Sequence, residues 1–213
     1  TEKAFYVLGG MYEYLVSNAK ISFLELTDAI DIIAENGKAK AVVIKTKDHE
    51  AMTVYGKYII AAPGRGGAEW LSEQTRKLSI KTDNNAVDIG VRVEVPNSIM
   101  DHLTKDLYEA KLVYYSDTFD NKVRTFCMNP GGVVSQENYE DGLALVNGHS
   151  YADDSLKTDN TNFAMLVSTK FTEPFKEPIE YGKYVARLAN MLTGGGILVQ
   201  RLGDLLQGRR TDK

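Results

Sequence analysis

The stretch RTFCMNPGGVVSQENYEDGLALVNGHSYAD, residues 124–153, decides the fold of the C-terminal half of the chain. Apolar runs on both sides of Pro130-Gly131-Gly132 predict two strands joined by a turn, because glycine tolerates the backbone angles of tight turns. An acidic turn at 137–141 and a third apolar run follow, and that run ends at the polar bend 147–150. We therefore predict three consecutive strands, typical of a mostly antiparallel sheet.

The residues around this stretch extend the same pattern. Alternation of apolar and polar residues in VDIGVRVEVP predicts a strand over residues 87–96. Asn97 or Ser98 is expected to cap a short helix that ends near Lys105. The other strands predicted in this half cover residues 110–116, 122–128, 132–136, 143–146 and 164–171. A helix is predicted over 179–192, and the glycines at 194–196 separate it from helical turns within 198–206.

The N-terminal part predicts a helix followed by a β-meander. Phe5, Leu8 and Tyr12 recur at helical spacing within residues 1–19. Short apolar runs predict strands at 21–25, 29–34, 42–44 and 54–61, with a hairpin turn at Asn36-Gly37. A helix is expected over 68–78, and a polar stretch at 81–85 separates the two halves. The predicted fold class is mixed α/β, of the α+β kind.

Composition and charge exclude several classes of protein. The chain has 213 residues, 43% of them hydrophobic, and a formal net charge of -4, so a nucleic-acid partner is not expected. No apolar run reaches the roughly 18 residues of a membrane span, so no membrane partner is expected. One cysteine and three scattered histidines predict neither a disulfide nor a metal site, and a cytoplasmic location is the expectation.

Four blocks of the C-terminal half occur in the order found in a known family. They are GVRVEVP (90–96), FCMNPGG (126–132), VNGHS (146–150) and QRLGDLL (200–206), and the segment IIAAPG (59–64) resembles part of an FAD domain. The chain thus resembles the large bacterial FAD-dependent dehydrogenases of unassigned substrate, which are two-domain flavoproteins. Asn129 stands where that family usually has a second cysteine, and Val95 where it usually has a histidine, so no cysteine pair is expected.

The resemblance implies a domain organisation. Residues 1–80 are expected to be part of an FAD/NAD(P)-binding domain with a β-meander, 86–192 a substrate domain with flanking helices, and 193–213 a helix that returns toward the FAD domain. The Gly-x-Gly-x-x-Gly loop that cradles a pyrophosphate is missing from the sequence, so we expect an internal fragment of a longer protein. FAD is the implied cofactor, and we expect this chain alone to bind it weakly or not at all.

The same resemblance implies site residues, each of which also has a purely structural interpretation. His149 is the expected proton donor or acceptor, and otherwise belongs to a turn. The glycine-rich turns either serve the sheet alone or bring main-chain N–H groups to a flat flavin ring. The residues expected to bind the cofactor are Pro63, Gly64, Arg65, Asn129, Pro130, Gly131, Gly132, Asn147, Gly148, Gln200 and Arg201.

Two further features stay open at this level. Arg92 and Glu94 share one face of a predicted strand, which is either an exposed face or a surface for substrate. The whole chain is interpreted as a fragment of an FAD-dependent oxidoreductase that passes a hydride between a small-molecule substrate and flavin. A non-catalytic ligand-binding module with structural glycine turns is the alternative, and the use of NAD(P)H is undecided.

Overall fold

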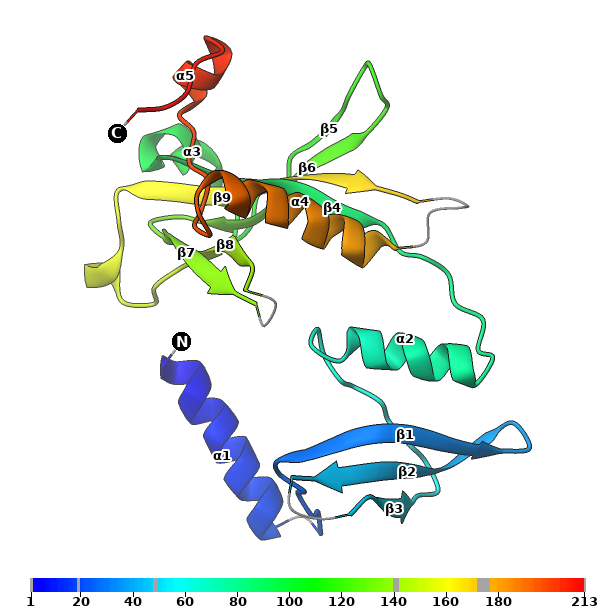
Figure 1. The fold of residues 1–213 in the computed structure, drawn as a ribbon. Coiled ribbons are helices and arrows are strands. Elements are labelled where there is room, and N and C mark those ends of the chain that lie inside the picture. The colour runs from blue at the N-terminus through cyan, green and yellow to red at the C-terminus, as the bar shows by residue number, and fades with distance from the viewer. Residues whose placement is uncertain (1, 19, 48–49, 140–141, 172–176, 213) are drawn as a thin grey trace. The chain divides into compact units, whose positions relative to one another are not determined.

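The computed structural model describes residues 2–18, 20–47, 50–139, 142–171 and 177–212 (Figure 1). The chain divides into two compact units, residues 1–82 and 83–213. The described residues form five α-helices and nine strands, and the strands make three antiparallel sheets. The predicted mixed α/β class is confirmed.

The first unit contains a helix, a three-stranded meander and a second helix. Its elements are α1 (Glu2–Asn18), β1 (Thr27–Glu35), β2 (Lys38–Thr46), β3 (Met52–Tyr55) and α2 (Ala68–Lys77). The strands lie in the order β1-β2-β3. Asn36 and Gly37 have φ angles of 53° and 73°, as the predicted hairpin turn requires.

Two strands predicted in this unit are wrong. Residues 21–25 form no strand, and the strand expected over 54–61 is limited to Met52–Tyr55. The neighbouring strand explains the second error, since β2 begins at Lys38 and Gly56 N already donates to Lys40 O. An apolar run forms a strand only beside a strand that can receive its hydrogen bonds. Tyr58 and Ile60 are therefore exposed, at 82% and 91%.

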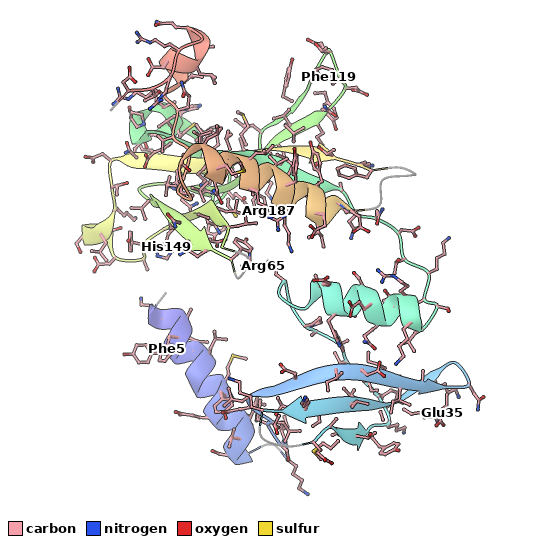
Figure 2. The ribbon with its side chains drawn as sticks, in the orientation of Figure 1. Phe5, Glu35, Arg65, Phe119, His149 and Arg187 are labelled. Carbon is pink, nitrogen blue, oxygen red and sulfur yellow. The ribbon has the colours of Figure 1, made fainter. Side chains whose placement is uncertain are left out.

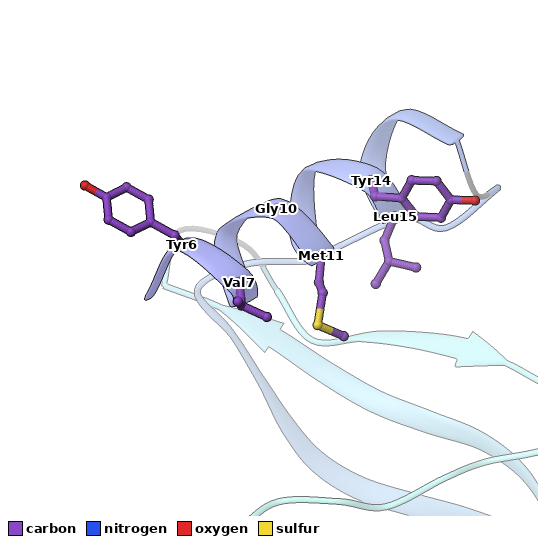
Figure 3. A pocket seen from close by; sticks show the side chains of 6 residues that line it. All are labelled: Tyr6, Val7, Gly10, Met11, Tyr14 and Leu15. Atoms are coloured by element: carbon purple, nitrogen blue, oxygen red, sulfur yellow. The ribbon is translucent and has the colours of Figure 1, made fainter. Parts of the chain in front are cut away.

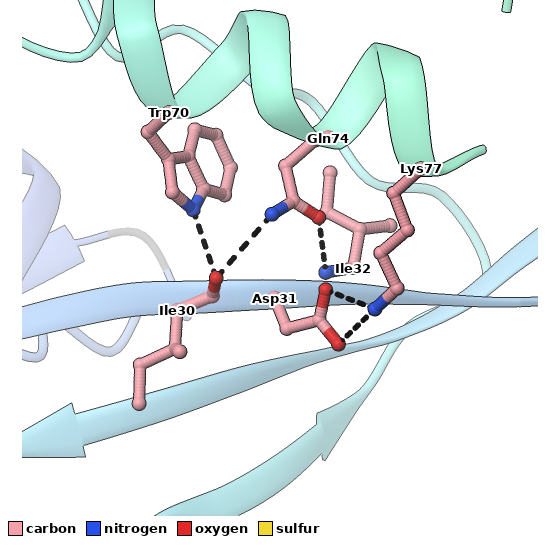
Figure 4. A network of polar contacts seen from close by, with 6 residues as sticks. All are labelled: Ile30, Asp31, Ile32, Trp70, Gln74 and Lys77. Atoms are coloured by element: carbon pink, nitrogen blue, oxygen red, sulfur yellow. Dashed lines mark hydrogen bonds and ion pairs between the residues drawn. The ribbon is translucent and has the colours of Figure 1, made fainter. Parts of the chain in front are cut away.

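Side chains of α2 bond the free edge of β1 (Figure 4). Gln74 is buried, and its Oε1 accepts from Ile32 N at 3.0 Å while its Nε2 donates to Ile30 O at 3.4 Å. Trp70 Nε1 donates to the same Ile30 oxygen at 3.0 Å. The register of β1 shifts at this point, between Ala29 and Asp31. The Gln74 amide thus takes the place of a neighbouring strand and satisfies an edge that is otherwise open to pairing.

Replacing Gln74 by alanine is expected to destabilise the first unit by about 2 kcal/mol, because Ile32 N would be left buried without an acceptor. Lys77→Ala is the matched control on the same helix. Its ion pair with Asp31 is partly exposed and contributes less than about 1 kcal/mol. Urea unfolding followed by Trp70 fluorescence would measure both. Equal losses for the two variants would contradict the role assigned to Gln74.

Helix α1 carries an apolar hollow on one side (Figure 3). Its lining comes from this helix alone: Tyr6, Val7, Gly10, Met11, Tyr14 and Leu15. At the other side of the helix Tyr12 packs on Phe23, with ring centroids 4.9 Å apart, and its hydroxyl donates to Glu25. A hollow without converging polar groups cannot orient a ligand, so we do not count it as a candidate site.

The second unit is built on a four-stranded sheet with a separate hairpin. The sheet order is β4-β9-β6-β5, and β7 pairs only with β8 among the described strands. The elements are β4 (Val87–Pro96), α3 (Asn97–Thr104), β5 (Val113–Tyr115), β6 (Lys122–Asn129), β7 (Val133–Asn138), β8 (Ala144–His149), the 3₁₀ helix η1 (Asp154–Leu156), β9 (Asn160–Thr169), α4 (Pro178–Leu192) and α5 (Leu202–Leu206).

The three strands predicted within residues 124–153 are present, but they do not share one sheet, and the third continues to His149, so residues 147–149 form strand in place of the expected bend. The chain leaves the four-stranded sheet at Asn129 and starts the β7–β8 hairpin at Val133. Part of the acidic turn, residues 140–141, lies outside the described residues. Strand β9 begins at Asn160, before the predicted start at 164, because residues 160–163 pair with the end of β4. Strand β5 is shorter than predicted.

Helices α3 and α4 pack on this unit in different ways. Met100 of α3 forms a small hydrophobic core with Ala110 and Met128. At its start α4 approaches β4 through Gly182. Near its end the buried Asn190 accepts from Ala144 N and donates to Ala144 O, each at 2.9 Å. The Asn190 side-chain amide thus forms hydrogen bonds with the main chain at the edge of β8, just as the Gln74 amide does at the edge of β1.

Candidate functional site

A β-bulge at Cys127 is the centre of the candidate site. Phe126 pairs with Ala164 but Asn129 pairs with Asn162, so β6 carries one extra residue. Cys127 has a φ of 45°, which is strained for a residue other than glycine. Its carbonyl oxygen accepts from Arg92 Nη2 and from Asn129 Nδ2, both at 2.7 Å, and its N–H donates to Glu109 Oε1 at 2.9 Å. These bonds hold the strained residue in place.

Arg92 connects this bulge to β9. Its Nε and Nη2 donate to Asn162 Oδ1 at 2.9 Å and 2.6 Å. Asn162 is fully buried, and its Nδ2 has no hydrogen-bond partner within the described chain. Arg92 itself is half-buried, and this burial lowers the pKa of its guanidinium. We call Arg92, Cys127, Asn129, Gly148 and Asn162 the Arg92 cluster.

Gly148 brings the β7–β8 hairpin against this cluster. A Cβ at this position would lie 1.6 Å from Arg92 Nη2 and 2.3 Å from Asn129 Nδ2. Only a residue without a side chain allows the main chain of β8 to lie directly on the guanidinium. Ser150 Oγ, two residues on, donates to Asn129 Oδ1 at 2.7 Å. Residues of β4, β6, β8 and β9 therefore meet at one point.

The Pro-Gly-Gly turn is closed by bonds within the protein. Gly131 N donates to Asn97 Oδ1 at 3.2 Å, and Gly132 N donates to Asn129 O at 3.3 Å. The carbonyl oxygens of the two glycines accept from Thr158 N and Thr158 Oγ1, at 2.8 Å and 2.7 Å. The N–H groups that were expected to reach a flavin ring thus already have acceptors, and contact with a flavin would have to replace those bonds.

Residues 86–213 match the family model described as FAD-dependent protein, C-terminal domain-like. The chain belongs to this family. An uncharacterized protein of Clostridium beijerinckii (strain ATCC 51743 / NCIMB 8052) is 31% identical over 199 residues, which cover 84% of this chain and 37% of the relative. The chain therefore spans little more than a third of the length of the curated relative that it matches.

In this FAD-dependent family member, two other predicted residues lie beside the Arg92 cluster. His149 is half-buried, and its ring packs edge-on against Tyr151, with centroids 5.0 Å apart. Figure 2 marks His149 on the hairpin. Asn147 Nδ2 donates to Glu137 Oε1 at 2.8 Å, and its Oδ1 accepts from Gly148 N. The His149 ring is thus positioned by a neighbouring aromatic ring, and its role in proton transfer stays a prediction.

Other predicted site residues lie in other parts of the chain. Gln200 Nε2 donates to Arg209 O, and Arg201 N donates to Thr211 Oγ1, each at 2.9 Å, so both residues are bonded within the C-terminal segment. They precede α5, so the prediction that they lie in a helix is wrong. Pro63, Gly64 and Arg65 belong to the first unit, where they form the turn before α2. The expected strand end at this turn is absent from the described residues.

Sequence reasoning missed Asn162 and Thr158, and it misjudged Asn97. The residue before α3 at the N-cap is Pro96, and Asn97 uses its side chain to hold the turn instead of the helix. Both Asn162 and Thr158 lie before residue 164, where the last predicted strand begins. A usable signal was present, since three polar residues, Asn160 to Asn162, directly precede an apolar strand.

Replacing Asn97 by alanine is expected to destabilise the second unit by about 2 kcal/mol or more. Its Oδ1 accepts from Gly131 N and from Thr161 Oγ1, and its Nδ2 donates to Thr158 O at 3.0 Å. Ser98→Ala, at the exposed next position of the same helix, is the control and should be nearly neutral. Thermal unfolding of both variants would test this, and a neutral Asn97→Ala would show that the turn does not depend on Asn97.

The described residues give two further findings. No described helix has the length and apolar character needed to cross a membrane. Within the described ranges, no three side chains of His, Cys, Asp or Glu gather in a way that could hold a metal ion.

Proposed function

We propose that the full-length protein is an FAD-dependent oxidoreductase that transfers a hydride between a small-molecule substrate and the flavin. The family match over residues 86–213 carries this proposal, because it relates the second unit to the C-terminal domain of FAD-dependent proteins. In this proposal residues 86–192 supply the substrate domain, and residues 1–80 supply part of the FAD domain. The flavin carries out the redox step, while the protein binds and orients the substrate and the flavin and excludes water from the site.

The geometry of the Arg92 cluster supports the proposal. Three sequence blocks, GVRVEVP, FCMNPGG and VNGHS, contribute Arg92, Asn129 and Gly148 to it. Residues as far apart as 92 and 162 are joined there by short hydrogen bonds. A cluster held by hydrogen bonds among three strands, with a fourth strand packed against it at Gly148, keeps its geometry when a ligand binds, as a site for oriented chemistry requires.

Individual roles follow from this arrangement as proposals. His149, beside the cluster, would donate or accept a proton near the substrate. Asn147, Gly148 and the turn Asn129–Gly132 would form the side of the site nearest the flavin. Residues 63–65 and 200–201 are assigned to FAD contacts outside the cluster. NAD(P)H as a further electron carrier and a cytoplasmic location belong to the same proposal.

The test of this function is the flavin content of the full-length protein. Acid release followed by chromatography should identify FAD at about one molecule per chain. This 213-residue chain, purified separately, should retain little or none. A full-length protein that is folded and carries no FAD after incubation with it would overturn the proposal.

A non-catalytic ligand-binding module remains the second candidate. The observation that favours it is the Pro-Gly-Gly turn, whose glycines have all their main-chain groups bonded within the protein. A full-length protein that binds FAD but cannot be reduced by any electron donor, including NAD(P)H, would support this candidate over the enzyme.

A further inference from the structure

We propose that Arg92 is a binding site for an anionic oxygen group, a carboxylate or a phosphate, of a small ligand. The contacts of the Arg92 cluster alone support this binding site. Its assignment to the substrate, which would make the substrate class anionic, rests on the proposed function.

First, the positive charge of Arg92 is not neutralised by any described residue. A half-buried guanidinium loses hydration, and an opposite charge normally offsets that loss. Among the described residues Arg92 forms no ion pair, and its partners, Asn162 Oδ1 and the Cys127 carbonyl, are neutral. Arg124 on the same sheet is different, since its Nη2 lies 2.6 Å from Asp88 Oδ2.

The nearby carboxylates are engaged elsewhere or face water. Glu109 accepts from Cys127 N and pairs with Lys111 at 3.6 Å. Glu94, two residues along the same strand, is exposed and forms no ion pair within the described chain. Neither carboxylate therefore neutralises Arg92, and the positive charge is left for a ligand.

The second step is the balance of donors and acceptors. Asn162 Oδ1 accepts two N–H groups of Arg92, and the Cys127 oxygen accepts one from Arg92 and one from Asn129. A carbonyl oxygen has two lone pairs, so both acceptors are fully used. In the described chain Arg92 Nη1 and the buried Asn162 Nδ2 have no acceptor. The cluster thus has a surplus of donors, and an oxygen-rich ligand would bind at Arg92 Nη1, because Asn162 Nδ2 is enclosed.

The third step is preorganisation. Asn162, the Cys127 bulge and the Gly148 main chain fix three sides of the guanidinium. A guanidinium fixed in one orientation presents its remaining Nη1 N–H groups to a carboxylate or phosphate oxygen with little loss of rotamer freedom. An anion both neutralises the charge of Arg92 and accepts hydrogen bonds from the free donors. A neutral carbonyl group accepts hydrogen bonds but leaves the charge unpaired.

The inference is tested by NMR titration of the 213-residue chain without flavin. Sodium acetate and inorganic phosphate are added separately at constant ionic strength, against sodium chloride, while the Arg92 Nε–Hε and Gly148 amide resonances are followed. We expect saturable shifts with a Kd of about 1 mM for at least one of the two anions. Saturation by acetate alone indicates a carboxylate ligand, and saturation by phosphate alone indicates a phosphorylated one.

Variants separate a specific site from general attraction of anions. Arg92→Gln should weaken the binding at least tenfold, as read from the Gly148 amide, while Arg76→Gln on the exposed face of α2 should leave it unchanged. Arg92→Lys keeps the charge and should bind with intermediate strength. The inference is overturned by the absence of saturable shifts with both anions, or by equal shifts in folded Arg92→Gln, with folding checked by circular dichroism.

This outcome is independent of the flavin. If neither anion binds and the full-length protein contains FAD, the anion site is wrong and the proposed function stands. If an anion binds and the full-length protein lacks FAD, the site stands and its assignment to a flavoenzyme substrate is withdrawn.

Discussion

Gly148→Ala is expected to destabilise the second unit by about 3 kcal/mol or more, because overpacking of a fixed site forces neighbouring groups to move. The added Cβ would lie 1.6 Å from Arg92 Nη2 and 2.4 Å from its Cζ. Arg92 would have to leave its place, and its bonds to Asn162 and to the Cys127 carbonyl would be lost. The free energy of unfolding, measured in urea by circular dichroism, checks this expectation.

The matched control is Gly203→Ala. Gly203 lies in α5 of the same unit, and nothing lies within 4 Å of the Cβ that alanine would add. Alanine is more favourable than glycine in a helix by up to about 1 kcal/mol, so this variant should be neutral or slightly more stable. A Gly148→Ala protein as stable as Gly203→Ala would mean that the hairpin does not lie on the guanidinium.

Gly90→Ala is expected to destabilise the same unit by a comparable amount, about 3 kcal/mol, but through the β4–β9 ladder. The new Cβ would lie 2.0 Å from the carbonyl oxygen of Met165 and 2.9 Å from Leu166 Cδ2. A backbone oxygen cannot rotate away as a side chain can, so the two strands would have to separate locally. Loss of amide protection in hydrogen exchange around residues 90 and 165 would reveal this separation.

Gly182→Ala provides the comparison for Gly90→Ala. Gly182 in α4 also faces β4, but its added Cβ would lie 3.5 Å from Val87 and 3.9 Å from Ile89, which are ordinary contact distances. This variant should keep or slightly raise stability. If both glycine variants destabilise equally, the effect is general to the helix and strand packing and does not come from the close approach at Gly90.

The periodicity of the sequence predicted most strands and helices because these elements bury one regular face. VDIGVRVEVP alternates, and the structure pairs all ten residues of this strand with β9. Periodicity does not predict a strand correctly where its formation depends on an adjacent strand. Gly56 to Pro63 is apolar enough for a strand but has no strand beside it, since β2 begins at Lys38.

The candidate site could be predicted only in part, for a related reason. The glycine-rich blocks supply two residues of the Arg92 cluster, Asn129 and Gly148, and their role in binding a cofactor stays a prediction. The convergence on Arg92 depends on one extra residue in β6, which sets Asn129 opposite Asn162. A one-residue difference in register reverses which face a side chain occupies, and the polar run Asn160 to Asn162, although unusual before an apolar strand, does not encode that register.

The sequence also did not predict which polar residues would form hydrogen bonds with a strand edge. Gln74 and Asn190 each lie in a helix that reads as amphipathic, where a polar residue is ordinarily expected on the outer face. In the structure both are buried, and each bonds the main chain of a strand at the edge of a sheet. Their role depends on where the strand edge lies, which is a property of the tertiary fold.

The most direct test of the proposed oxidoreductase is the visible absorption spectrum of the full-length protein during anaerobic titration with electron donors. A protein that transfers hydride to FAD should show the flavin band, lose it after uptake of two electrons per flavin, and regain it when an oxidant is admitted. A folded full-length protein with no flavin band, even after incubation with FAD, would contradict the proposal at its base.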